Sequence, residues 1–281
     1  MTIRCIWEHN GPDSLLHLAG YPGAYTRGAS LEEALAKVPA ELAAWHRWLG
    51  LDAPADCAAE IVQEHAADLQ VRDADSDVLF DCEAGPLTPE DYRRLKALAL
   101  RSAQDFLRLY RAVPDPDASC LPARATFYGQ RPRTAREMYE HTKNVNSYYF
   151  GEIGVDAGNE GNIAASRARG FALLEQRPGY LENPVVDGSY GEQWSLKKVC
   201  RRFVWHDRIH AKAMWRMACR TFGAGSVPDV FCFGGKCRRF CGRRKRPRRR
   251  GHSRLPGPAL RVRITAGRSA CGAASAAAPG S

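Results

Sequence analysis

The chain has 281 residues, of which 44% are hydrophobic and 26% are charged. This composition is ordinary for a globular protein and excludes a collagen, a coiled-coil rod and wholesale disorder. The length fits one large domain or two modest ones, and we expect two. No apolar run approaches the ~18 residues that span a bilayer, and the first residues lack the pattern of a secretory signal. We therefore expect a cytoplasmic protein with no membrane segment.

The net charge of +10 comes from one end of the chain. Residues 233–281 hold 14 of the 41 Lys and Arg and no Asp or Glu, so residues 1–232 hold 27 basic against 31 acidic residues, a net charge of −4. A basic protein often binds nucleic acid. Here we expect a nucleic-acid partner only if the basic tail supplies the contacts.

The basic tail, residues 233–281, is rich in Gly, Ala, Pro, Ser and Arg, and this composition predicts disorder. The run Arg243–Arg250 has seven basic residues in eight and could bind phosphate backbones. A second hypothesis is a zinc knuckle made by Cys232, Cys237, Cys241 and His252. A third, which we favour, is out-of-frame translation, because the composition changes abruptly after Phe231 to residues with GC-rich codons.

Residues 1–75 are predicted to form a small α+β domain. Ser30 followed by Glu33 is a capping box, which predicts a helix running towards Trp48. Short runs of strand-forming residues flank this helix. The predicted strands are Thr2–Trp7, Leu15–Leu18 and Ala59–Arg72. Residues 76–87 are expected to link this domain to the next.

Residues 88–232 are predicted to form an all-α four-helix bundle. Thr88 followed by Pro89 and two acidic residues marks the start of the first helix. Its buried stripe recurs at steps of three and four, through Leu95, Ala99, Ser102, Phe106 and Leu109. The other helices are predicted to begin near Thr134, to span roughly Asn159–Gln176, and to span Ser195–Phe222. The connections between these four helices are long enough to cross the bundle, which favours a four-helix bundle.

Six cysteines are scattered through the body of the chain. Such spacing in a chain that can bury its own core favours reduced, mostly buried thiols over a disulfide scaffold. They are Cys5, Cys57, Cys82, Cys120, Cys200 and Cys219.

Three histidines fall on stripes that we expect to be buried: His141 on the second helix of the bundle, and His206 with His210 on the fourth. Residues four apart on a helix share a face, so His206 and His210 can turn their rings towards one ion. A ring from His141 would complete a three-histidine site with a position open to water or substrate. Such a site favours Lewis-acid chemistry.

The alternative is that these histidines are satisfied by ordinary hydrogen bonds. For one histidine we would prefer it, whereas three imidazoles on the inward faces of two helices favour a metal. Asp207 and Arg208 point off this face and are expected to be solvated or to support the ligands. Basic residues nearby could attract an anionic thiol, although a solvated helix face is the commoner outcome. They are Lys197, Arg201 and Arg202.

The segment Phe203–Met214, with His141 on an earlier helix, resembles the DinB/YfiT-like four-helix-bundle superfamily over about half of the chain, residues 88–232. The resemblance implies that His141, His206 and His210 hold a divalent metal, zinc or nickel. It also implies a thiol-dependent transferase or isomerase that uses bacillithiol, mycothiol or glutathione. This chemistry is physically consistent, because a thiol on a divalent cation loses its proton near neutral pH.

The segment Tyr21–Ala34 resembles HicB-like antitoxin domains, in which a Pro-Gly turn, a strand, a Gly and a capped helix follow in this order. The resemblance covers roughly residues 1–72 and implies a partial ribonuclease-H-like or double-stranded-RNA-binding-like fold that binds a small toxin. The separate DNA-binding module usual in that family is not evident, since the predicted bundle follows instead. For this half we favour a role in packing or regulation.

Together these features predict an α+β protein, a small HicB-like module followed by a DinB-like bundle, that binds a divalent metal and acts as a thiol-dependent S-transferase. The alternative is a non-catalytic, stress-related or partner-binding scaffold that uses the HicB-like module for interaction. The sequence leaves open whether the chain is an enzyme. A homodimer is also expected, because dimers are common for such bundles.

Overall fold

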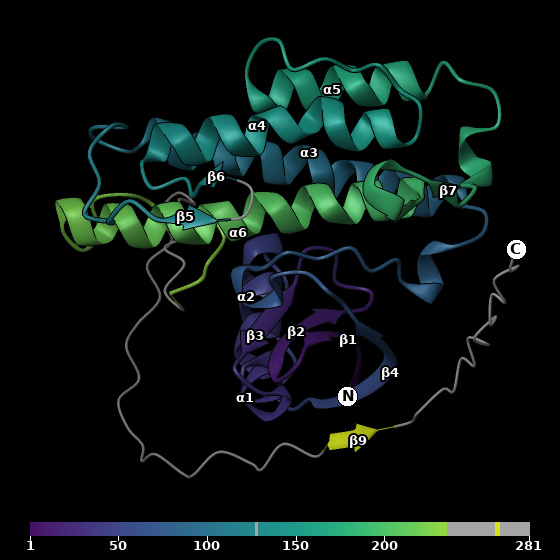
Figure 1. The fold of residues 1–281 in the computed structure, drawn as a ribbon, viewed down its shortest axis with the longest axis horizontal. Coiled ribbons are helices and arrows are strands. Elements are labelled where there is room, and N and C mark those ends of the chain that lie inside the picture. The colour runs from purple at the N-terminus through teal and green to yellow at the C-terminus, as the bar shows by residue number, and fades with distance from the viewer. Residues whose placement is uncertain (127–128, 235–261, 265–281) are drawn as a thin grey trace, which may run out of the picture.

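The structure, a computed structural model, describes residues 1–126, 129–234 and 262–264 (Figure 1). A small sheet lies on one side of a layer of long helices, so the predicted α+β class is confirmed. Most of the basic tail lies outside the described residues, and so do the predictions of disorder and of out-of-frame translation. The same holds for three members of the hypothetical zinc knuckle, Cys237, Cys241 and His252.

The sheet is mixed. Its first four strands lie in the order β3-β2-β1-β4, in which β1 pairs antiparallel with β2 and parallel with β4, and β2 pairs antiparallel with β3. A fifth short strand, β9, lies parallel to β4. The bounds are β1 Thr2–Asn10, β2 Asp13–Leu18, β3 Tyr25–Gly28, β4 Ala58–Ala66 and β9 Val262–Ile264. A parallel neighbour requires a crossover, which two helices supply between β3 and β4.

The crossover contains α1, Leu31–Ala36, and α2, Val38–Leu49, where the sequence predicted one helix. The predicted start is correct, because the Ser30 side chain accepts a hydrogen bond from the Glu33 amide. The helix then breaks at Lys37, since Pro39 has no amide proton to continue the ladder. The predicted strand Ala59–Arg72 is too long at its end, because β4 stops at Ala66 and the chain turns into a 3-10 turn, Val71–Asp73.

Residues that follow β4 also pack on the sheet. Ile6 of β1 clusters with Val78 and Phe80. A second cluster joins Leu15 and Tyr25 of the sheet to residues of the 67–74 segment and to the helix bundle; it contains Ala67, Val71, Ala74 and Trp205. Residues 67–80, which include the start of the expected linker, therefore lie between the sheet and the bundle as part of the folded core.

The four long helices begin at residues the sequence marks as caps. They are α3 Pro89–Arg111, α4 Ala135–Glu152, α5 Ile163–Leu174 and α6 Leu196–Phe222, capped by Thr88, Thr134, Asn162 and Ser195. The side chains of all four caps accept hydrogen bonds from first-turn amides. Helix α6 packs along α3 and α4, and α5 packs against the same two helices (Figure 1).

The connection from α4 to α5 runs back along α4. The Asn146 side chain donates to the Gly158 carbonyl, and the Asn159 side chain accepts from the Ser147 amide. Helices α4 and α5 therefore run in the same direction, and their ends meet where the rings of Phe150 and Phe171 lie 5.2 Å apart. This crossing brings α4 beside α6.

The six scattered cysteines are free thiols, as predicted. Cys5 and Cys200 are buried, and burial raises the pKa of each to about 12. The expectation that most would be buried is wrong for Cys82 and Cys120, which are exposed: Cys82 lies in the short 3-10 turn Asp81–Glu83, and Cys120 lies in the connection after α3.

The sheet and the bundle meet at a close contact between the turn before β3 and α6. Gly23 has φ +79°, and a Cβ built there would lie 2.5 Å from Val204 Cγ1 and 2.9 Å from the Val204 backbone carbon. The Gly23 carbonyl also accepts a hydrogen bond from Arg208 Nε at 3.0 Å. One continuous hydrophobic cluster extends from the first strand to Phe231.

Gly23→Ala is expected to lower the free energy of unfolding by about 2 kcal/mol, from left-handed backbone strain and overpacking against α6. Urea unfolding would measure it. Gly20→Ala is the matched control, because Gly20 has φ +83° with open space around it. The control should lose only the backbone part, about 1 kcal/mol. Equal losses in the two variants would mean that the contact with α6 is not tight.

Candidate metal centre

The structure brings the three predicted histidines together. His206 and His210 lie one turn apart on α6, with ring centroids 4.5 Å apart. His141 reaches them from α4, with its ring 5.0 Å from that of His206 and 4.7 Å from that of His210. One nitrogen of each ring lies within 4.8 Å of the others. A single small cation could therefore contact all three.

The site lies at the rim of the bundle. His206 is buried, His210 is half-buried and His141 is exposed, so one side is accessible from solvent. The expectation that His141 is on a buried stripe is wrong. The buried face of α4 is shifted by one residue, to Thr142, Asn146 and Tyr149, because α5 and the returning connection cover that face.

The ring nitrogens of the three histidines have no hydrogen-bond partner among the residues that the structure describes. In the described part of the chain, no backbone or side-chain group forms a hydrogen bond with any of these rings, and His206 Nδ1 is buried without a partner. Each of the other four described histidines has a polar neighbour at 2.8–3.2 Å. They are His9, His17, His46 and His65. Buried imidazole nitrogens are normally hydrogen-bonded, so the exception favours an exogenous ligand here.

The electrostatic surroundings keep these rings neutral. Loss of hydration where the His141 ring faces the other two histidines lowers its pKa. Burial also lowers the pKa of His206 well below its usual value, and the neighbouring histidines, Arg202 and Arg167 add to this effect. The pKa of His210 is lowered well below its usual value by burial, by His141 and by Arg131. The neutral imidazole is the form that binds metal.

A second group of potential ligands lies on the sheet. Oxygen and nitrogen atoms of Glu8, His65 and Asp77 also lie within 4.8 Å of one another. These atoms have partners, since Glu8 Oε1 accepts from the Asp77 amide at 2.9 Å and His65 Nε2 lies 2.8 Å from Asp77 Oδ1. Glu8 Oε2 lies 3.2 Å from His17 Nε2. The group holds the 76–78 segment on the sheet.

The charged residues next to the histidines on α6 are buried, so the expectation of solvated side chains is wrong. Asp207 and Arg208 are both inaccessible, and neither is hydrogen-bonded to the three histidines. Arg167 of α5 forms two bonds to Asp207, Nη1 to Oδ2 at 3.1 Å and Nη2 to Oδ1 at 3.2 Å, and Ser102 of α3 donates a third. Arg208 pairs with Glu41 of α2 at 2.6 Å.

Arg201 and Arg202 are also buried rather than on a solvated face. Arg201 Nε donates to Glu83 Oε1, and Arg202 donates to the Ser76 carbonyl. Lys197, by contrast, is partly exposed. The cause is that residues 76–83 cover this side of α6, which a helical pattern cannot show. Nothing in the sequence marked Glu83 or Arg167 as the counter-charges.

Tyr149 is a neighbour of the site that the sequence did not suggest. Its ring centroid lies 6.0 Å from that of His206 and 5.3 Å from that of Phe203. The sequence pattern gave little indication of Tyr149, because Tyr148 and Tyr149 are adjacent and the register of α4 decides which of the two faces inward. Tyr149 gives the inner wall of the site an apolar surface.

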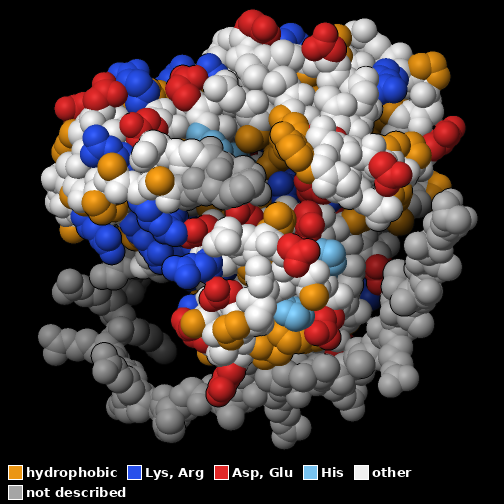
Figure 2. Space-filling view, viewed as in Figure 1, with side chains coloured by type: hydrophobic (Ala, Val, Ile, Leu, Met, Phe, Trp, Pro, Cys, Tyr) orange, Lys and Arg blue, Asp and Glu red, His pale blue; other side chains and the backbone are white. Residues whose placement is uncertain are grey.

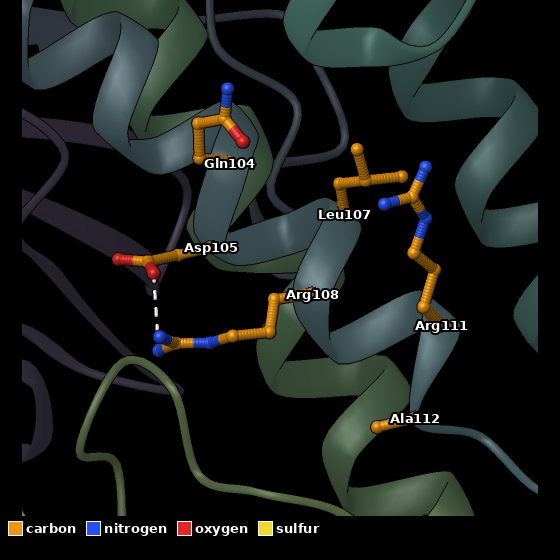
Figure 3. A pocket seen from close by; sticks show the side chains of 6 residues that line it. All are labelled: Gln104, Asp105, Leu107, Arg108, Arg111 and Ala112. Atoms are coloured by element: carbon orange, nitrogen blue, oxygen red, sulfur yellow. Dashed lines mark ion pairs between the residues drawn. The ribbon is translucent and has the colours of Figure 1, made fainter. Parts of the chain in front are cut away.

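A hollow of about 410 Å³ lies elsewhere, on the surface of α3 (Figure 3). Its lining side chains are mostly charged or polar, and Arg108 and Asp105 form an ion pair across it at 3.1 Å. The residues that line the hollow are Gln104, Asp105, Leu107, Arg108, Arg111 and Ala112. No histidine lines this hollow, so it is separate from the candidate metal centre.

Comparison of the chain with models of protein families, with curated proteins and with solved structures finds no match. The resemblances to DinB/YfiT-like bundles and to HicB-like domains therefore stay predictions. Within the part of the chain that the structure describes, no helix is long and apolar enough to cross a membrane.

Proposed function

We propose that His141, His206 and His210 bind a divalent cation, zinc or nickel, and that the chain acts there as a thiol-dependent S-transferase. The observation that carries the first part is the convergence of three neutral imidazoles without hydrogen-bond partners, beside four other described histidines that all have them. The residues fit the metal, since three nitrogen ligands with one accessible side are typical of catalytic zinc sites.

A divalent cation at these rings would supply Lewis acidity that converts a thiol ligand to its thiolate near neutral pH. Tyr149 covers the inner side of the site beside His206, while the exposed edge at His141 leaves room for a small molecule. No described cysteine belongs to the histidine group, and burial keeps Cys5 and Cys200 protonated. We therefore take the thiol to be a small molecule from outside the chain.

Metal analysis of the purified protein tests the centre. About one equivalent of zinc or nickel is expected in the unmodified chain. His141→Ala, His206→Ala and His210→Ala should each lose most of it, because each removes one of three ligands. His46→Ala is the control, since the His46 ring is hydrogen-bonded to the Leu42 carbonyl at 2.9 Å and lies outside the group. Stoichiometric metal retained in the His210→Ala protein would refute the assignment.

Thiol consumption tests the reaction. The metal-loaded protein is incubated with an electrophile and with glutathione, bacillithiol or mycothiol in turn, and free thiol is followed over time. Consumption above that of the His206→Ala protein is expected with one of the three. Bound metal without turnover would favour the alternative, a non-catalytic scaffold whose N-terminal module binds a partner. The predicted homodimer is checked in the same preparation by light scattering.

A further inference from the structure

A group of basic side chains lies where β3 meets the C-terminal half of α6. Figure 2 shows Lys and Arg side chains gathered on one face of the molecule. The group comprises Arg27 of β3 with Arg208, Lys212 and Arg216 of α6. The proposed metal chemistry uses none of them. Arg216 lies one turn after Lys212 on α6, Arg27 lies two residues after Tyr25 on β3, and the Tyr25 ring centroid lies 5.6 Å from Lys212 Nζ, so the two elements bring these side chains to one junction.

The acidic groups nearby do not balance these cations. Glu41 is paired with Arg208 at 2.6 Å and lies 3.8 Å from Lys212 Nζ. Within the described residues, neither Arg27 nor Arg216 has an ion pair; Arg27 donates one bond, to the Arg72 carbonyl at 2.8 Å. Among the described ion pairs, Glu41 therefore serves Arg208 and Lys212 together, and no carboxylate pairs with Arg27 or Arg216. Like charges held together in a partly buried setting repel one another, and a bound anion would relieve that repulsion.

Aromatic rings hold the group in place and supply a further donor. Lys212 Nζ lies 5.6 Å from the ring centroid of Tyr25 and 5.2 Å from that of Phe233. Tyr25 is only 4% exposed, and burial raises the pKa of its hydroxyl to about 12, so the hydroxyl keeps its proton. That hydroxyl is not hydrogen-bonded to any described residue. It is available to donate to a ligand.

We propose that Tyr25, Arg27, Lys212 and Arg216 form a binding site for a phosphate group of a small molecule, at the junction of the sheet and the bundle. Phosphate matches the surplus of charge, and guanidinium groups bind its oxygens through paired N–H donors. A nucleic-acid strand is bound through basic contacts along several phosphates, whereas these side chains gather at one junction. Because β3 and α6 both contribute, the ligand would also bridge the two parts of the fold. The proposal does not depend on the metal centre.

Titration calorimetry with pyrophosphate on the full-length, metal-free protein tests this site. Arg27→Met and Arg216→Met should each weaken binding roughly tenfold, because each removes charge-assisted hydrogen bonds. Tyr25→Phe should weaken binding severalfold with the ring packing kept. Arg111→Met, an exposed arginine on α3, is the control and should bind as the unmodified chain does. His206→Ala should also bind normally, which separates this site from the metal centre.

A thermal melt gives an independent measurement. Without ligand, Arg216→Met should melt at the same temperature as the unmodified chain or higher, because repulsion is relieved. Pyrophosphate should raise the melting temperature of the unmodified chain and leave that of Arg216→Met nearly unchanged. The proposal is wrong if the unmodified chain does not bind pyrophosphate, or if the Arg27 and Arg216 variants bind it equally well. Binding of a single-stranded oligonucleotide alone would also overturn it.

Discussion

Asp207→Asn should lower the free energy of unfolding by about 3–5 kcal/mol, because it leaves a buried guanidinium without its counter-charge. Arg167 and Asp207 are both inaccessible to solvent, and their two hydrogen bonds join α5 to α6. Ser102 ties the same carboxylate to α3. The Arg167 guanidinium also lies over the Phe203 ring at 3.7 Å, so it has no route to water. Chemical denaturation monitored by fluorescence would measure the loss.

The chain offers a matched control for this variant. Arg136 and Asp117 form the same two-bond pair, at 2.6 and 2.8 Å, on the surface. Asp117→Asn should change stability little, because solvent screens an exposed pair. The double variant Asp207→Asn with Arg167→Met should recover part of the loss, since it removes the stranded charge. If Asp207→Asn were as mild as the surface control, the buried pair would not hold α6 in place.

Acidification should destabilise the metal-free protein in part through His17. This ring is fully enclosed beside Glu8, and burial is the main cause of its lowered pKa. A histidine with a lowered folded pKa contributes stability that is complete above its unfolded pKa of about 6.5 and is lost as the pH falls. The unfolded chain then takes up a proton that the folded chain resists. The loss begins as the pH falls through about 6.5, has a slope of at most about 1.4 kcal/mol per pH unit, and ends at the folded pKa.

The variant His17→Gln isolates this contribution. As the pH falls below 6.5, its unfolding free energy should fall less steeply than that of the unmodified chain, until the folded His17 ring of the unmodified chain is protonated as well. Glu8 acts at lower pH: burial opposes its ionisation, but bonds from His17, Ser76 and the Asp77 amide lower its pKa to about 2. The contribution of Glu8 to the free energy of unfolding should be lost as the pH falls from about 4.5 towards 2. Parallel curves for the two proteins above pH 5 would show that His17 titrates freely in the folded state.

Local signals predicted the helices well. Ser30 and Thr88 cap helices as predicted, because a cap involves only the residues that follow it. The helices predicted to begin near Thr134 and at Ser195 do begin there, and these two residues cap them. The pairing of His206 with His210 was predictable for the same reason, since spacing on a single helix fixes it. The approach of His141 depended on how α4 packs on α6, and the register on α4 was predicted one residue off.

Features that depend on distant residues could not be predicted. Arg201 and Arg208 have the charge pattern of a solvated face, yet Glu83 and Glu41, far away in sequence, cover and neutralise them. The end of β4 was also not predictable from the pattern. The residues after Ala66 alternate in polarity as a strand would, but they pack against Trp205 and not beside a neighbouring strand. The basic group was invisible for the same reason, since Tyr25 meets Lys212 only through the tertiary fold.

One side of α6 packs on the sheet, and the other side packs on the other helices. Neither the N-terminal sheet nor the helix bundle should therefore stay folded when it is separated from the other. A fragment ending near residue 75 would leave Tyr25 and Leu15 without Trp205, and would leave the Glu41 carboxylate without Arg208. The complementary fragment would leave Arg208 without its partners and would expose Val204 to solvent. Residues 1–234 should therefore unfold as one cooperative piece, and limited proteolysis should cut the chain slowly between the halves.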